Sequence, residues 1–181
     1  MSDGPPAVLV MAPSGETADG QLAAALRSEA ERWAGEVAPG RVHFADGPVA
    51  EATERVFAER PGPVLAIWPV LARFRPEHAV GALGDLEAGA GLVIGPVIDG
   101  GGLYLLGLSR PLGELVSVPD ETWSGEGAMS AALQAAAEAG LEVGILRAER
   151  ALRSPDDVRA ALADPLTPDQ IGRILVGLKQ D

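Results

Sequence analysis

The stretch LVIGPVIDGGGLYLLGL, residues 92–108, decides how the rest of the chain is interpreted. Its two apolar runs, Leu92–Ile94 and Leu103–Leu108, carry no charge and do not alternate with polar residues, which is typical of strands buried on both faces. Between them, Gly100–Gly102 permit backbone conformations that side chains forbid, and they let a ligand approach the main chain closely. Asp99 is costly to bury, so we expect its carboxylate to reach solvent, a donor, a cation or a ligand. The alternative is a structural glycine turn in which Asp99 bonds to its own backbone.

Short apolar runs alternate with amphipathic segments along the whole chain. We expect strands at residues 7–11, 41–45, 64–68, 92–94, 103–108 and 142–147, and helices at 21–34, 49–59, 76–87, 127–138 and 154–163, with a last amphipathic helix after Thr167-Pro168-Asp169. The order βαβαβαββαβαα calls for a mostly parallel sheet with helices on both faces. No repeat or linker divides the sequence, so residues 1–181 are expected to form a single α/β domain of Rossmann-like architecture.

The first strand is followed by a loop of turn-forming residues, Ala12–Gly20, and then by a helix. This geometry places ligands at the carboxyl edge of an open sheet, although an ordinary βα connection would have the same pattern. A tryptophan flanked by small polar residues precedes a later helix, and it either lines a pocket or packs in the core. The candidate ligand-binding residues are Pro13, Ser14, Gly15, Gly100, Gly101, Gly102, Trp123 and Ser124.

The composition excludes several classes of function. A net charge of −12 disfavours nucleic acid and anionic membranes as partners, because both require basic surfaces. The sequence contains no cysteine, which excludes disulfides and thiolate chemistry, and the lack of lysine in its N-terminal half excludes a Walker-type phosphate loop. No apolar run is long enough to span a membrane, and the N-terminus does not resemble a signal peptide. We therefore expect a cytoplasmic protein.

The glycine-rich stretch resembles bacterial glycosyltransferase-A-like proteins of the nucleotide-diphospho-sugar transferase superfamily. Their distinctive segment runs Gly-Pro-Ala-x-Asp-Gly-Gly-Tyr-x-Leu-x-Gly-Leu, and residues 95–108 match it with one residue more. The Trp-Ser/Gly segment that follows in the family corresponds to Trp123-Ser124-Gly125. The resemblance covers Val64–Leu162 well and extends weakly to the N-terminus. It implies a glycosyltransferase-A-like fold and a nucleotide or sugar-like ligand.

Three family motifs are altered, which makes this chain resemble a degenerate member. The family's Lys-Thr-Arg-Leu stands here as DGQL at 19–22, and its Gly-Thr-Asp-x-Pro as WPVLA at 68–72, where Val70 replaces a metal-ligating aspartate. Its Asp-Val-Asp-Thr-Pro-x-Asp becomes ALRSPDD at 151–157, which keeps the helix-capping part. Transfer from a nucleoside diphosphate needs a divalent cation or equivalent positive charge. The altered motifs imply no metal site and no cofactor.

Two function classes follow. The favoured one is a pseudoenzyme, a transferase-like domain with eroded metal and phosphate sites that binds a ligand or a partner, because fold alone does not carry function. The alternative is a metal-independent glycosyl- or nucleotidyl-transferase, in which Asp99 and Arg153 are catalytic and arginine replaces the cation. A nucleotide or sugar-like molecule is the expected small partner, and pairing through an apolar edge leaves a homodimer open.

Overall fold

Six strands form one sheet in the part of the chain that the computed structural model describes, residues 4–12, 20–98 and 101–178. Strand β5 runs antiparallel to both of its neighbours, and the other described strand pairs are parallel. The expected α/β fold with a mostly parallel sheet is thus confirmed. The order across the sheet is β2 (Val42–Ala45), β1 (Ala7–Met11), β3 (Val64–Ile67), β5 (Leu103–Leu108), β4 (Leu92–Pro96) and β6 (Val143–Ile145).

The antiparallel direction of β5 follows from the short connection that precedes it. Parallel neighbours need a crossover of a dozen or more residues, and only six residues separate Pro96 from Leu103. The chain therefore turns back between Pro96 and Leu103 and pairs Ile94 with Leu106. The connection contains Gly100–Gly102 and is called the glycine segment below. All six residues of β5 are buried, as the uninterrupted apolar pattern predicts. This turn brings residues 101–102 to the edge at which the parallel strands end.

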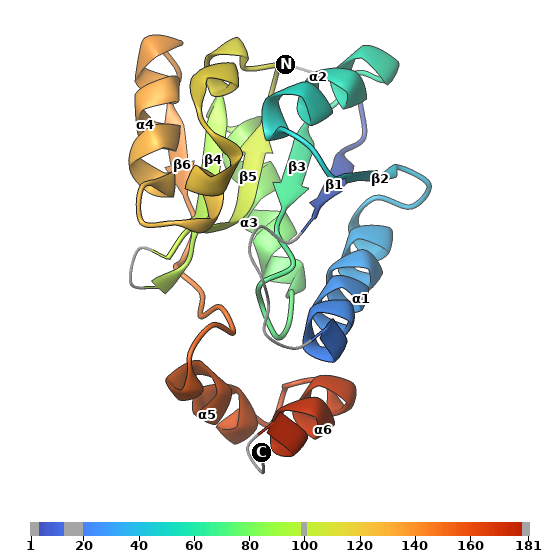
Figure 1. The fold of residues 1–181 in the computed structure, drawn as a ribbon. Coiled ribbons are helices and arrows are strands. Elements are labelled where there is room, and N and C mark those ends of the chain that lie inside the picture. Colours follow the sequence, from blue (N-terminus) through green and yellow to red (C-terminus); the bar gives the residue numbers. More distant parts are fainter. Residues whose placement is uncertain (1–3, 13–19, 99–100, 179–181) are drawn as a thin grey trace.

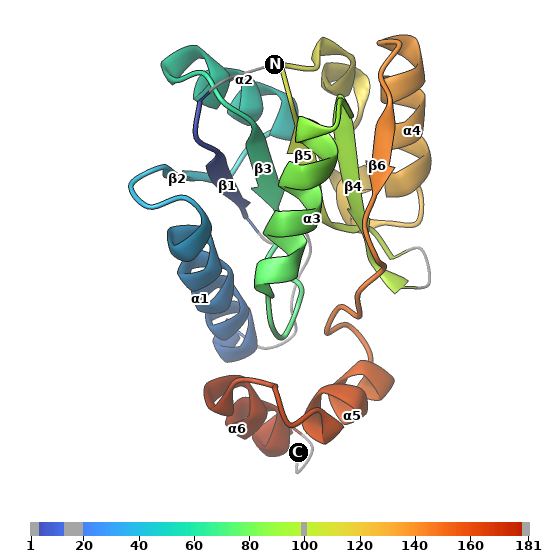
Figure 2. The ribbon, with the colours of Figure 1, turned by 180° about the vertical axis from the view of Figure 1, so that it is seen from behind.

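Helices cover both faces of the sheet (Figures 1 and 2). On one face lie α2 (Val49–Glu59), α4 (Ala128–Glu138) and two short 3₁₀ helices, η2 (Gly113–Ser117) and η3 (Asp120–Ser124). On the other face lie α1 (Gly20–Val37) and α3 (Pro76–Glu87). Each face has its own buried apolar cluster, which is the arrangement that a doubly covered sheet requires.

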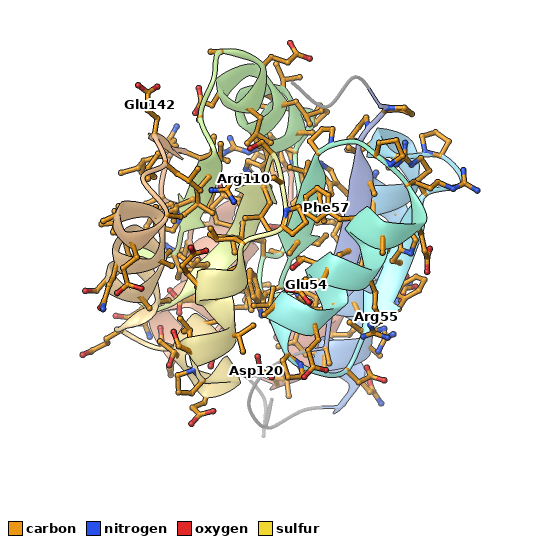
Figure 3. The ribbon with its side chains drawn as sticks, turned by 90° about the horizontal axis from the view of Figure 1, so that it is seen from above. Glu54, Arg55, Phe57, Arg110, Asp120 and Glu142 are labelled. Carbon is orange, nitrogen blue, oxygen red and sulfur yellow. The ribbon has the colours of Figure 1, made fainter. Side chains whose placement is uncertain are left out.

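The two 3₁₀ helices lie in the connection between β5 and α4, where the sequence pattern predicts neither a strand nor a longer helix. Pro119 precedes η3, and Asp120 then accepts a hydrogen bond from the backbone N–H of Val49 at 3.3 Å. Figure 3 shows Asp120 beside the start of α2. The segment before α4 is consequently tied to a helix far away in the sequence, and this contact fixes where Trp123 and Ser124 lie.

The last two helices, α5 (Pro155–Ala163) and α6 (Asp169–Leu178), lie beyond the carboxyl edge of the sheet rather than on a face (Figure 1). The side chain of Ser154 caps α5 by accepting a hydrogen bond from the backbone N–H of Asp157 at 3.2 Å. Buried apolar residues of α6, including Ile171, pack against the first turns of α1, including Leu26. The pair therefore closes over the edge at which open α/β sheets bind ligands.

Most element boundaries agree with the sequence within a few residues. Strand β6 is shorter than the expected 142–147 because it lies at the edge of the sheet and pairs only with β4. Helix α1 continues three residues past the expected end at Ala34, and its buried residues still include Trp33 and Ala34. Within the described residues, no helix has the length and apolarity needed to cross a bilayer.

Candidate ligand site at the carboxyl edge of the sheet

Three loops meet where β3, β4 and β6 end, and backbone hydrogen bonds join them. Leu71 and Ala151 form an antiparallel bridge, and the N–H of Leu152 donates to the carbonyl of Val70 at 3.0 Å. On the other side of this segment, the N–H of Ile98 donates to the carbonyl of Glu149 at 2.8 Å. The loop after β6 is therefore held between the loops that follow β3 and β4.

The side chains at this junction are apolar and packed. Leu71, Ala151 and Leu152 are each at most 7% exposed, so they fill the space between the β3 and β6 loops. A metal ligated by carboxylates would need oxygen side chains here. In the described part of the chain, no group of three or more His, Cys, Asp or Glu side chains is placed to hold a metal ion. The residues present at this junction do not fit the divalent cation that the resemblance implies.

The glycine segment returns to β5 with its backbone pressed against the η3 segment. Gly102 has a φ of +108°, a conformation that side-chain-bearing residues rarely adopt. A Cβ atom at this position would lie 2.7 Å from the carbonyl oxygen of Trp123 and 2.8 Å from the carbonyl carbon of Ser124. A glycine is therefore required here by both the turn and the close backbone contact.

Arg153 joins the same two segments through its guanidinium group. Its Nη1 atom donates to the carbonyl oxygen of Ser124 at 2.7 Å and also to the carbonyl oxygen of Gly101. Partial burial of the guanidinium lowers the pKa of Arg153, and the nearby Asp157 carboxylate opposes this effect. The arginine consequently connects α5, the glycine segment and η3.

Trp123 packs inside the fold. Its side chain is 1% exposed and stacks on Trp68, with 6.2 Å between ring centroids and 27° between ring planes. Among the described residues, the buried indole Nε1 of Trp123 has no hydrogen-bond partner. The neighbouring Ser124 hydroxyl donates to the carbonyl of Glu121 at 3.0 Å, within the 3₁₀ turn. Of the two interpretations of this segment, the geometry favours packing for Trp123.

The structure thus brings half of the candidate residues together. Gly101, Gly102, Trp123, Ser124 and Arg153 form one contact region at the carboxyl edge. The other candidates lie outside the described residues, so their placement beside this contact region stays a prediction; they are Pro13, Ser14, Gly15, Asp99 and Gly100.

A partly buried ionic cluster next to this region is not predicted by the sequence. The N–H of Arg75 donates to Nδ1 of His78 at 3.3 Å, which leaves Nε2 of His78 facing Oε1 of Glu149 at 3.4 Å. The Arg75 guanidinium pairs with the same carboxylate. Burial alone would raise the pKa of Glu149, but the hydrogen bond from His78 and the positive charges of Arg75 and Arg147 outweigh it and lower that pKa.

Tyr104 closes the cluster from the sheet side. Its ring lies 5.0 Å from that of His78, and its hydroxyl donates to the carbonyl of Arg147 at 3.1 Å. Burial, and next the negative charge of Glu149, raise the pKa of Tyr104, so the phenol remains protonated and keeps this hydrogen bond. From the sequence, only the helix at 76–87 is predicted here, because a lone histidine in a helix does not reveal a carboxylate 71 residues away.

The sheet order and the antiparallel β5 form a glycosyltransferase-A-like α/β fold, the fold that the resemblance implies. A solved structure with this fold is that of a protein from Desulfovibrio desulfuricans G20, described as a "putative nucleotide-diphospho-sugar transferase". The two align with a TM-score of 0.68 over 97% of this chain and 95% of that chain, at 15% sequence identity. No protein family and no curated protein matches this chain. At this identity the likeness establishes the fold.

Proposed function

We propose that this protein is a transferase-like domain without transferase activity, which retains the fold in order to bind a small ligand or a partner. The observation that carries the proposal is the closed junction at the carboxyl edge. Val70 stands where the resemblance implies a metal-ligating aspartate, so its side chain offers no oxygen, and its backbone carbonyl accepts a hydrogen bond from the N–H of Leu152. The bridge between Leu71 and Ala151 leaves apolar side chains where charge neutralisation would be required.

The chemistry explains why this closure matters. Departure of a nucleoside diphosphate places negative charge on phosphate oxygens, and an active site must stabilise that charge with a cation or preorganised donors. The apolar side chains that fill the junction, Leu71, Ala151 and Leu152, supply neither carboxylates for a metal nor donors for a phosphate. Loss of one such preorganised group typically costs about 10²–10³ in rate, and here several positions differ at once.

The competing proposal is an arginine-assisted, metal-independent transferase. It is favoured by the position of Arg153 beside the glycine segment, where a leaving group would need positive charge. It is weakened by the two carbonyl oxygens that Nη1 of Arg153 already contacts, at Gly101 and Ser124. A guanidinium engaged with both loops acts as a structural connection between them.

Two measurements separate these functions. Thermal-shift screening of nucleotides and nucleotide sugars, each with and without Mn²⁺, detects binding, because a ligand that binds the folded state stabilises it. A product assay on each ligand that binds then detects turnover. We expect no release of nucleoside diphosphate and no effect of Mn²⁺. Metal-free release that is lost in both Asp99→Asn and Arg153→Ala would overturn the proposal.

The remaining features belong to the same proposal. A cytoplasmic location, a nucleotide or sugar-like ligand and the absence of nucleic-acid or membrane partners rest on composition and on the resemblance. A homodimer through an exposed edge strand is compatible with the exposed Ile145 on β6. Sedimentation at several protein concentrations tests the dimer.

A further inference from the structure

A hollow of about 260 Å³ lies between the β3–α3 loop, the segment after β6 and the α5–α6 pair. It is separate from the contact region around Gly102, because none of the residues of that region lines it. Its size is below the range of drug-sized ligand pockets, which begins at about 300 Å³, so it suits a small molecule. Three arginines contribute to its walls, namely Arg73, Arg75 and Arg150.

Two of these arginines are neutralised within the hollow. Arg75 pairs with Glu149, and Nη1 of Arg150 donates to Oδ1 of Asp157 at 3.0 Å. Arg73 differs, because Nη1 contacts only the carbonyl oxygen of Leu166, at 3.4 Å, among the described residues. A guanidinium with this single long contact retains most of its five N–H donors for a carboxylate or a phosphate.

The acidic side chains of the hollow are held in place by the fold. The Glu149 carboxylate is fixed by Arg75 and His78, and the Asp157 carboxylate by Ser154 and Arg150. The third, Asp164, accepts the N–H of Leu166 at 2.9 Å. A carboxylate offers about four lone-pair sites, and Asp157 already accepts four hydrogen bonds, from Arg150, the Ser154 hydroxyl and the backbone N–H groups of Arg153 and Ser154. Acceptor capacity for the hydroxyl groups of a ligand therefore remains at Glu149 and Asp164. Because these acceptors are already positioned, little ordering is required when hydroxyls bind.

We propose that the hollow binds a small polyhydroxylated anion, whose phosphate or carboxylate group pairs with Arg73 and whose hydroxyls donate to the carboxylates of Glu149 and Asp164. A neutral sugar has no anionic group to pair with Arg73, and inorganic phosphate lacks the array of hydroxyls that would reach the carboxylates. The proposal rests on the ligand-binding role proposed above and names the ligand class and the residue that selects it.

Calorimetric titration with four probes tests this site on the full chain: glucose 6-phosphate, glucuronate, glucose and inorganic phosphate. We expect at least one of the two sugar anions to bind about tenfold more tightly than both glucose and inorganic phosphate. The tighter of the two shows whether the anionic group is phosphate or carboxylate. If neither sugar anion binds, or if inorganic phosphate binds as well as both, the proposal is wrong.

Variants identify the residue responsible. Arg73→Gln should weaken the binding of the sugar anion about tenfold or more, which is a loss of about 1.4 kcal/mol in binding free energy. Arg110→Gln is the matched control, because Arg110 lies at the opposite edge of the sheet, after the antiparallel β5 (Figure 3). Equal losses in both variants would overturn the assignment. An unchanged thermal midpoint in Arg73→Gln shows that the fold is intact, and Arg73→Lys supplies a second variant that keeps the charge without the planar guanidinium.

The outcomes of the two proposals are distinguishable. Turnover of a nucleotide sugar would contradict the lack of transferase activity, whatever binds in the hollow. If neither sugar anion binds and no turnover is seen, only the proposal of a ligand site in the hollow is contradicted.

Discussion

Replacing Gly102 by alanine should be one of the most damaging single-methyl changes in this chain. The added Cβ would lie 2.7 Å from the Trp123 carbonyl oxygen and 2.8 Å from the Ser124 carbonyl carbon, and both of these atoms belong to the backbone. The clash cannot be relieved by a side-chain rotation, so either the turn or η3 must move. The φ of +108° adds conformational strain.

The two costs can be estimated separately. An unfavourable backbone conformation costs about 1–3 kcal/mol, and overpacking typically costs about 1–3 kcal/mol. Since movement of η3 would relieve both together, we expect Gly102→Ala to lower the free energy of unfolding by about 2–4 kcal/mol. For a chain of this size, that corresponds to a fall in the thermal midpoint of roughly 4–16 °C.

Equilibrium urea unfolding and calorimetry measure this change. Gly113→Ala is the control, because a Cβ at Gly113 has no atom within 4 Å and the backbone there is not in the left-handed region. The control should change stability by less than about 0.5 kcal/mol. A loss of less than about 0.5 kcal/mol in Gly102→Ala would refute the close backbone contact between the glycine segment and η3.

Three further changes test the surrounding structure. Ser154→Ala removes the cap of α5 and should lower the free energy of unfolding by about 1 kcal/mol. Amide hydrogen exchange should become faster in α5 of the variant than in α5 of the wild type, and more so than in the sheet. Equal protection of α5 in the two proteins would contradict this. Trp33→Phe loses the hydrogen bond from Nε1 to the carbonyl of Arg75, at 2.8 Å, whereas Trp123→Phe removes an N–H without a partner among the described residues. Urea midpoints should therefore show Trp33→Phe to be more destabilising by about 1 kcal/mol. Because the fold lowers the pKa of Glu149 below 4.5, its ionised form stabilises the protein above that pH, and this contribution is lost as the pH falls through the folded-state pKa. Glu149→Gln should accordingly lose less stability than the wild type between about pH 5 and pH 3, and parallel acid-unfolding curves would contradict the pairing.

The sequence by itself determined the strands, the main helices and the class of fold. Buried strands such as Leu103–Leu108 are recognisable because an apolar run without alternation has few other stable environments. The antiparallel return into β5 was not predicted, although the short glycine connection requires it. Local signals, such as Ser154-Pro155 before α5, also gave a helix start that the structure confirms.

The contacts of the candidate residues were decided only in three dimensions. Arg153 donates to backbone carbonyls of Gly101 and Ser124, and a carbonyl acceptor is present at every residue, so no sequence pattern singles it out. The pocket interpretation and the packing interpretation of Trp123 predict the same local pattern, and only its stacking on Trp68 distinguishes them.

The ionic cluster around Glu149 and the hollow lined by three arginines could likewise not be predicted from the sequence. Glu149 lies 74 residues from Arg75, and Arg73 differs from the other two arginines of the hollow because it forms no ion pair with any described residue. Charge pairing depends on distances of a few ångströms between segments that the sheet and α5 bring together. Periodicity records which side of an element is buried, whereas it carries no information about which charged group of another element lies opposite.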